Sequence, residues 1–115
     1  MATAVFIGRQ EIRGFAALAP MAGVADRAFR RLCVDYGAAY VVSEMVSCKG
    51  LCFGDRKSEE LLVLDEGEHP AAIQLFGDDP DIMARAAERA MAAGPEIIDI
   101  NMGCPAPKIA GNHCG

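Results

Sequence analysis

Four short apolar runs, separated by polar or helix-forming segments, constrain the fold of this chain more than any other feature. Each run has the length and composition of a buried strand. The runs cover residues 15–21, 38–46, 70–77 and 96–102. Strands that alternate with helices along a chain pair in parallel, with the helices as crossovers. The order predicts a parallel α/β sheet, and two extended segments at 4–8 and 10–14 predict a short β-hairpin before it.

Two of the intervening segments carry clear helix signals, and residues 55–64 carry weaker ones. Asp26 and Asp79 are predicted N-caps, and Pro80 suits a first helical turn. The first helix is expected to bury an apolar face of Ala28, Phe29, Leu32, Cys33 and Tyr36. Its exposed face is expected to carry Arg27, Arg30 and Arg31. The second helix is expected to bury a stripe of Ile82, Met83, Ala86, Ala87, Ala90 and Met91.

Two architectures complete such a pattern, an open doubly wound sheet and an eight-stranded (β/α)8 TIM barrel. A barrel needs about 250 residues, so the 115 residues of this chain would form less than half of one. With 52% hydrophobic and 23% charged residues, the composition is that of a globular domain. The length suffices for one small domain and not for two.

Charge and cysteine content argue against several classes of protein. The net charge is −5 and the basic residues are scattered among acidic ones. This pattern argues against direct binding of nucleic acid by this segment. The five cysteines are an odd number and no secretory signal precedes them, so we expect a cytoplasmic chain with reduced thiols. No apolar run approaches the roughly 20 residues that span a bilayer. Cys48 and Cys52 lack a second ligand pair, so no metal site is predicted.

Polar residues interrupt the apolar runs near their carboxyl ends. Glu44 lies in the second run, Gln74 in the third, and Asp99 and Asn101 in the fourth. Because alternate residues of a strand share a face, Asp99 and Asn101 point one way and their isoleucine neighbours point the other. The helix-facing side of a parallel sheet is apolar, so the polar side chains are expected to face a barrel interior or a cleft. Each alone could satisfy a core hydrogen bond, but together they favour a binding site.

Cys104 stands between a glycine and a proline just after the fourth run. Pro105 restricts Cys104 to extended backbone, and Gly103 lets a flat ligand approach the backbone closely. Catalytic groups of TIM barrels come from this position, the carboxyl end of a strand. An ordinary thiol is mostly protonated near pH 7 and can act as an acid without special tuning. The alternatives are a structural turn thiol, or a nucleophile that would need a base or cation not evident in the sequence.

Four segments together resemble the N-terminal part of tRNA-dihydrouridine synthases, and most of all the bacterial B-type branch. In chain order they are APMAGVADRAFRRLC, VSEMV, IQLFG and IIDINMGCPAPKI. The resemblance runs from about Gly14 to Gly115. Other flavin-binding barrels share the APMAG motif, whereas the Gly-Cys-Pro motif with its downstream Lys108 is much more specific.

The resemblance implies an FMN-dependent (β/α)8 barrel followed by a helical domain. Such an enzyme reduces the 5,6 double bond of uridine in tRNA, with NADPH as the reductant. Pro20, Met21 and Ala22 would lie beneath the isoalloxazine ring of the flavin. Gln74 would hydrogen-bond the pyrimidine edge of the flavin. Asn101 would help to hold the target uracil, or the flavin near it.

The resemblance also makes Cys104 the general acid, which protonates uracil C5 after a hydride has reached C6. The target base must leave its stack to reach such a pocket. Cys114 is a second thiol nearby, but the motif belongs to Cys104, so Cys114 is expected to be incidental. His69 and His113 receive no role, because the family's functional histidine lies further along the chain.

Residues 1–115 are therefore expected to form the N-terminal half of an FMN-binding TIM-barrel domain. The C-terminal half-barrel and the helical tRNA-binding domain would lie outside the sequence, and most contacts with tRNA with them. Such a fragment has open strand edges and is expected to be inactive alone. One alternative is another FMN-dependent barrel that acts on a free pyrimidine or enone, which would not normally carry the Gly-Cys-Pro setting. The other is a non-catalytic α/β module with a binding or scaffolding role.

Overall fold

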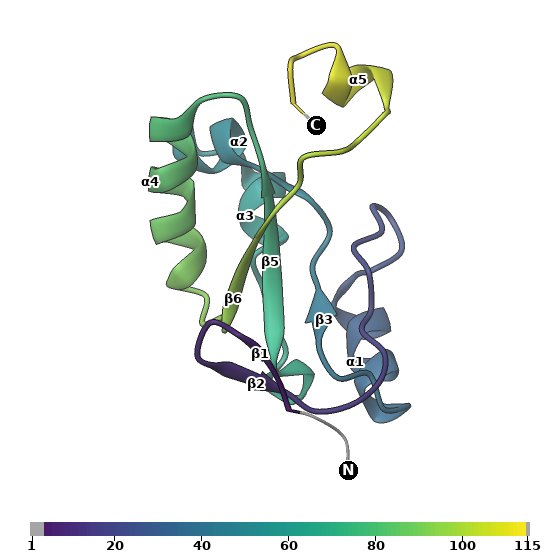
Figure 1. Ribbon diagram of the computed structural model, residues 1–115. Helices are drawn as coiled ribbons and strands as arrows, with labels where there is room; N and C mark the ends of the chain where they lie inside the picture. Colours follow the sequence, from purple (N-terminus) through teal and green to yellow (C-terminus); the bar gives the residue numbers. More distant parts are fainter. Residues whose placement is uncertain (1–3, 115) are drawn as a thin grey trace.

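The computed structural model describes residues 4–114 (Figure 1). The described chain opens with an antiparallel hairpin of β1 (Val5–Ile7) and β2 (Gln10–Ile12). Gly8 lies in the turn between them with φ +58°, a left-handed conformation that glycine adopts without steric cost. The predicted hairpin is confirmed, and Figure 1 shows it at the end of the molecule opposite the C-terminus.

A second sheet has β5 (Ala71–Phe76) at its centre. β6 (Ile97–Ile100) pairs with one edge of β5. The other edge pairs with β3 (Val41–Val42) near the start of β5 and with β4 (Val46–Ser47) near its end. All of these pairs are parallel, as the alternation of strands and helices predicts.

β3 and β4 are two parts of the single strand expected at residues 38–46, and residues 43–45, which begin with Ser43, separate them. The Ser43 backbone N–H donates to the Ala72 carbonyl at 2.9 Å. The Gln74 N–H, however, donates to the Ser43 side-chain Oγ at 3.0 Å and not to a backbone carbonyl. A hydroxyl that bonds the backbone in this way competes with the ladder of the sheet. Regular pairing resumes at Val46.

The prediction of a regular, buried strand at residues 15–21 is wrong. The segment forms one isolated parallel bridge between Leu18 and Val41, in which the Leu18 N–H donates to the Tyr40 carbonyl at 3.0 Å. Phe15 is completely exposed. The physical reason is position, since the segment lies on the outer edge of the sheet with β3 as its neighbour.

The order of the strands across the sheet distinguishes the two architectures. With the segment at 15–21 counted, the order is this segment, then β3 with β4, then β5, then β6, which is also the order along the chain. A barrel keeps chain order, whereas a doubly wound sheet reverses it partway. The fold is therefore an α/β parallel sheet consistent with part of a TIM barrel, preceded by a small hairpin.

Three predicted helices are confirmed. They are α1 (Arg27–Asp35), α3 (Arg56–Glu60) and α4 (Pro80–Met91). The predicted caps are confirmed too, since Asp26 accepts the Phe29 N–H at 2.8 Å and Asp79 accepts the Ile82 N–H at 3.1 Å. Sequence periodicity missed three elements that are too short to show it. They are α2 (Cys48–Cys52), the 3₁₀ helix η1 (Glu66–Glu68) and α5 (Pro107–Ala110).

The expected burial of α1 is wrong in part. Arg30, predicted to be exposed, is buried with only 3% of its surface accessible, whereas Leu32 and Tyr36 are 51% and 86% exposed. The Arg30 Nε donates to Glu68 of η1 at 3.0 Å, so an ion pair and not an apolar face holds α1 against η1. Leu32 and Tyr36 lie on a face that the described chain leaves open to solvent. Ala28 is exposed as well.

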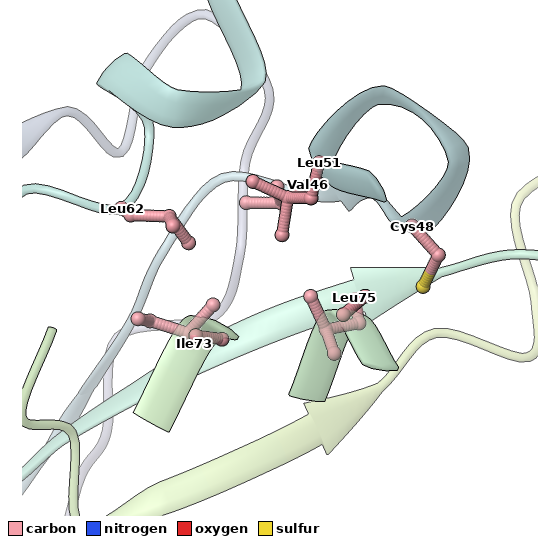
Figure 2. Close-up of a cluster of buried hydrophobic side chains, with 8 residues drawn as sticks. Val46, Cys48, Leu51, Leu62, Ile73 and Leu75 are labelled. Carbon is pink, nitrogen blue, oxygen red and sulfur yellow. The ribbon is translucent and has the colours of Figure 1, made fainter. Parts of the chain in front are cut away.

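The apolar core lies between the parallel sheet and the pair α2 and α4 (Figure 2). Ile73 and Leu75 of β5 point into this core and are completely buried. They pack with Val46, Cys48, Leu51, Leu62, Ala86 and Ala90. The predicted stripe of α4 is confirmed except at Met91, which is 49% exposed.

Within residues 4–114, no helix combines the length and the apolar character needed to cross a membrane.

Candidate functional site

The two central strands carry a hydrogen-bonded pair of polar side chains. Gln74 of β5 and Asp99 of β6 are register partners. The Gln74 Nε2 donates to the Asp99 Oδ2 at 2.6 Å. Gln74 is only 5% exposed, and it points away from the core that receives its neighbours Ile73 and Leu75. The pair therefore lies on the face of the sheet opposite α2 and α4.

Asn101 extends this pair into a chain of hydrogen bonds. The Asn101 Nδ2 donates to the Gln74 Oε1 at 3.1 Å, and the Asn101 Oδ1 accepts the Gly103 N–H at 3.1 Å. The backbone of Asn101 also continues the sheet, because its N–H donates to the Leu75 carbonyl at 2.9 Å. The prediction that these polar residues share one face is confirmed. We call the side chains of Gln74, Asp99 and Asn101 the amide-carboxylate chain.

Cys104 follows directly on the end of the amide-carboxylate chain and is half-buried. The bond from the Gly103 N–H to Asn101 fixes the backbone just before the cysteine. A Cβ atom at Gly103 would meet no other part of the described protein within 4 Å, so the space beside this glycine is free of protein atoms. That space lies beside the backbone that joins Asn101 to Cys104.

The segment that carries Pro20, Met21 and Ala22 forms a tight turn after the outer edge of the sheet. The Met21 carbonyl accepts the N–H groups of Val24 and Ala25, at 3.0 and 2.8 Å. Pro20 is half-buried, Ala22 is exposed and Met21 is 38% exposed. These side chains present an accessible apolar surface at the carboxyl end of the first parallel segment. We call residues 20–25 the Pro-Met loop.

The Glu44 side chain bonds the Pro-Met loop and does not join the amide-carboxylate chain. Its Oε1 accepts the Gly23 N–H at 2.6 Å. Gly23 has φ +76°, which other residues adopt only with strain. The sequence singled out Glu44 as a polar interruption, but a partner 21 residues earlier left no local signal.

Sequence reasoning missed Ser43, which joins the two parts of the site. Its Oγ accepts the Gln74 N–H and donates to the Glu44 carbonyl at 2.8 Å. It is completely buried. A hydroxyl between two valines and a glutamate in VVSE was the available signal.

The residues that follow Cys104 fold over the ends of β4 and β5. A groove there is lined by Ser47, Lys49, Phe76, Asp78, Lys108, Ile109, Gly111, Asn112, His113 and Cys114. Lys49 and Asp78 form an ion pair at 2.8 Å, and this hydrogen bond lowers the pKa of the Asp78 carboxyl. Cys114 is 7% exposed and its thiol is directed to the Asn112 carbonyl at 3.4 Å. Its burial makes it a poorer candidate for contact with a substrate than Cys104.

In the part of the chain that the structure describes, no three histidine, cysteine or acidic side chains gather closely enough to hold a metal ion. His69 lies away from these groups, paired with Glu96 at 2.8 Å near the start of β6.

Comparison with known proteins gives a consistent picture. A family model described as dihydrouridine synthase matches residues 17–115. The tRNA-dihydrouridine synthase B of Pseudomonas aeruginosa is 49% identical over 98 residues, which cover 85% of this chain and 30% of the relative. The protein of the same name from Vibrio cholerae is 45% identical over 103 residues, which cover 90% of this chain and 32% of the relative. The one from Pseudomonas putida is 45% identical over 113 residues, which cover 98% of this chain and 34% of the relative. The chain thus spans about a third of the length of these relatives.

Proposed function

Because this chain belongs to the dihydrouridine synthase family, we propose that it carries the general acid and one side of the flavin site of a tRNA-dihydrouridine synthase. The proposed reaction is the reduction of the 5,6 double bond of a uridine in tRNA, with FMN as cofactor and NADPH as reductant. Residues 1–115 are the N-terminal half of the catalytic barrel in this proposal. Since the relatives are about three times as long, the 115 residues alone are expected to be inactive.

The amide-carboxylate chain is the observation that carries the proposal. It runs from the middle of β5 to the backbone of Gly103 and so ends beside Cys104. A buried glutamine held on both sides at the carboxyl end of a parallel sheet is a fixed recognition group. A thiol placed directly after it can act on whatever the glutamine and its neighbours hold.

The residues present fit a flavin. The Gln74 amide uses one N–H on Asp99 and one oxygen lone pair on Asn101, which leaves one donor and one acceptor for the alternating pyrimidine edge of FMN. Met21 and Ala22 offer exposed apolar surface to the flat ring system. When bound and reduced by NADPH, FMN supplies the hydride that uracil C6 accepts.

Cys104 supplies the proton in the proposed mechanism. Its Sγ–H donates to uracil C5 as C6 gains the hydride, and the resulting thiolate recovers a proton from water. Gly103 leaves the space in which the base can approach, and Pro105 holds the cysteine backbone in the extended region. Asn101 keeps one N–H beyond its bond to Gln74, and this N–H would bond the uracil.

tRNA is the proposed partner, and regions beyond these residues are proposed to make most contacts with it. The net charge of −5 fits that division, because a surface that holds phosphates is basic. We place the activity in the cytoplasm, with no metal and no membrane required.

The test uses a chimeric barrel, in which the aligned segment of this chain replaces its counterpart in the Pseudomonas aeruginosa relative. Cys104→Ala should lower dihydrouridine formation in tRNA by roughly 10²–10⁴-fold, because the proton donor is gone. Bound flavin, measured by its absorbance near 450 nm, should stay unchanged. Dihydrouridine is measured in digested tRNA by mass spectrometry.

Cys114→Ala is the matched control and should retain activity, since Cys114 is buried and directed to a backbone carbonyl. If Cys114→Ala abolished turnover and Cys104→Ala did not, the assignment of the acid would be wrong. A chimeric barrel that reduced free uracil but not tRNA would identify a different flavin enzyme.

A further inference from the structure

Two side chains from separate elements hold the Pro-Met loop in place. Glu44, between β3 and β4, bonds the N–H of Gly23. Arg30, in α1, bonds the carbonyl of Ala25 with its Nη1 at 2.8 Å. The two contacts lie on either side of Val24. They fix the loop where it turns from the sheet into α1.

The contact to Glu44 is short, at 2.6 Å, and its acceptor is a carboxylate, which makes it stronger than a bond between neutral groups. The Glu44 backbone carbonyl also accepts the Ser43 hydroxyl, whose oxygen accepts the Gln74 N–H. These hydrogen bonds, joined through the covalent frame of Glu44, connect the Gly23 N–H to the backbone N–H of Gln74. The Pro-Met loop and the strand that carries Gln74 are therefore anchored to the same residue pair, Ser43 and Glu44.

The contact to Arg30 rests on a buried ion pair. Arg30 is 3% exposed, and Glu68 is completely buried. Arg30 uses its Nε on Glu68, its Nη1 on Ala25 and its Nη2 on the Val63 carbonyl, so the guanidinium joins three segments. The second oxygen of Glu68 is buried without a hydrogen-bond partner among residues 4–114. A buried pair with an unsatisfied oxygen is poor evidence of stabilisation, and a positioning role explains it better.

We propose that Glu44, supported by the Arg30–Glu68 pair, positions the Pro-Met loop so that Met21 and Ala22 lie at the correct height beneath the flavin that Gln74 holds. The inference rests on the proposed function and names how that site is kept in shape. Glu44 acts through Gly23 and not by contact with the reacting atoms. It is a positioning residue, and the bond that matters is the one accepted by its side-chain oxygen.

The test compares two substitutions at Glu44 in the chimeric barrel. Glu44→Ala removes the acceptor and should weaken FMN binding by about ten- to a hundredfold, the range for a hydrogen bond to a charged group. Glu44→Gln keeps a side-chain oxygen for the Gly23 N–H and should stay within about threefold of the unsubstituted barrel. FMN dissociation constants come from quenching of flavin fluorescence. Visible circular dichroism of the bound flavin should change for Glu44→Ala and not for Glu44→Gln.

Glu60→Ala is the matched control. Glu60 and Glu44 both line a groove beside Ala22 and Gly23 of the Pro-Met loop. Among residues 4–114 the Glu60 carboxylate pairs with Arg56 of α3 and not with the loop, so FMN binding should not change. Equal FMN affinity for Glu44→Ala and the unsubstituted barrel would overturn the proposal. Equal losses for Glu44→Gln and Glu44→Ala would overturn it too, because the retained acceptor would then not matter.

Hydrogen exchange of the flavin-free barrel tests separately whether Glu44 holds the Pro-Met loop. Glu44→Ala should speed exchange of peptides that cover residues 20–25 at least tenfold and leave β5 protected. Unchanged exchange in the Pro-Met loop would overturn the inference, and so would loss of protection throughout the barrel, which would assign Glu44 to general folding. If the unsubstituted barrel bound no FMN, the proposed function would fail, while this measurement would still decide whether Glu44 holds the loop.

Discussion

The two faces of β5 differ in what holds them. On one face, Ile73 and Leu75 are completely buried under α2 and α4 by apolar contacts. On the other face, Gln74 is held by directional bonds to Asp99 and Asn101. Apolar packing is non-directional and contributes most of the folding free energy, whereas the hydrogen bonds fix particular atoms in space. The difference places most of the apolar stabilisation on the helix side of the sheet and the proposed recognition groups on the other.

The largest expected effect comes from the helix side. Ile73→Ala in the chimeric barrel should lower the free energy of unfolding by about 2–5 kcal/mol, because a completely buried side chain leaves a cavity. The FMN affinity of the remaining folded protein should be unchanged. Urea unfolding, followed by circular dichroism, measures the first quantity, and flavin fluorescence measures the second.

Phe53→Ala is the control for this prediction. Phe53 is the C-cap residue of α2 and is 72% exposed, so its loss should lower the free energy of unfolding by less than about 1 kcal/mol. Equal costs at Ile73 and Phe53 would break the distinction between the packed core and the exposed surface on the helix side.

A substitution on the opposite face of β5, at Gln74, is expected to cause a smaller loss of stability together with a loss of FMN affinity. Gln74→Leu removes the partners of Asp99 and Asn101, and unpaired polar groups cost about 1–3 kcal/mol. FMN affinity should fall at the same time, which distinguishes this variant from Ile73→Ala. Unfolding and flavin titration are measured as before.

Gln10→Leu is the matched control, because the Gln10 amide bonds only the carbonyl of its neighbour Glu11 in the hairpin. It should change stability by less than about 0.5 kcal/mol and leave FMN binding intact. A Gln74→Leu variant that bound flavin normally would remove the glutamine from the proposed site.

Much of the fold was predictable because its signals are local. The capped, periodic helix α4 and the apolar run that becomes β5 were both expected. The common face of Asp99 and Asn101 follows from the alternation of side chains along a strand. These features depend on neighbours within a few residues, so the sequence carries them plainly.

The errors arose where a partner lies far away along the chain. Arg30 looked like a solvent-exposed residue because Glu68, its partner 38 residues later, gives no local sign. The segment at 15–21 is apolar enough for a buried strand, but its place at the edge of the sheet leaves Phe15 exposed. Ser43 divides an expected strand because its hydroxyl takes the place of a backbone acceptor.

The candidate site shows the same division. Gln74, Asn101 and Cys104 were recognisable as polar or constrained residues at strand ends, and their roles in binding and catalysis stay predictions. The bond between Glu44 and Gly23 was not predictable, because it needs the relative placement of two segments. Positioning contacts of this kind emerge only from the fold.

The smallest expected effect is a difference of at least tenfold between the labelling rates of two thiols, those of Cys48 and Cys104. Cys48 faces the core and is 1% exposed. Burial, with smaller contributions from Cys52 and Cys114, raises the pKa of the Cys48 thiol to about 11. Since the thiolate is the nucleophile, iodoacetamide at pH 8 should label Cys48 at least tenfold more slowly than the half-buried Cys104. Mass spectrometry of tryptic peptides measures both rates, and urea should abolish the difference. Equal rates in the folded protein would mean that α2 does not cover β5, and the contrast between the two faces would fail.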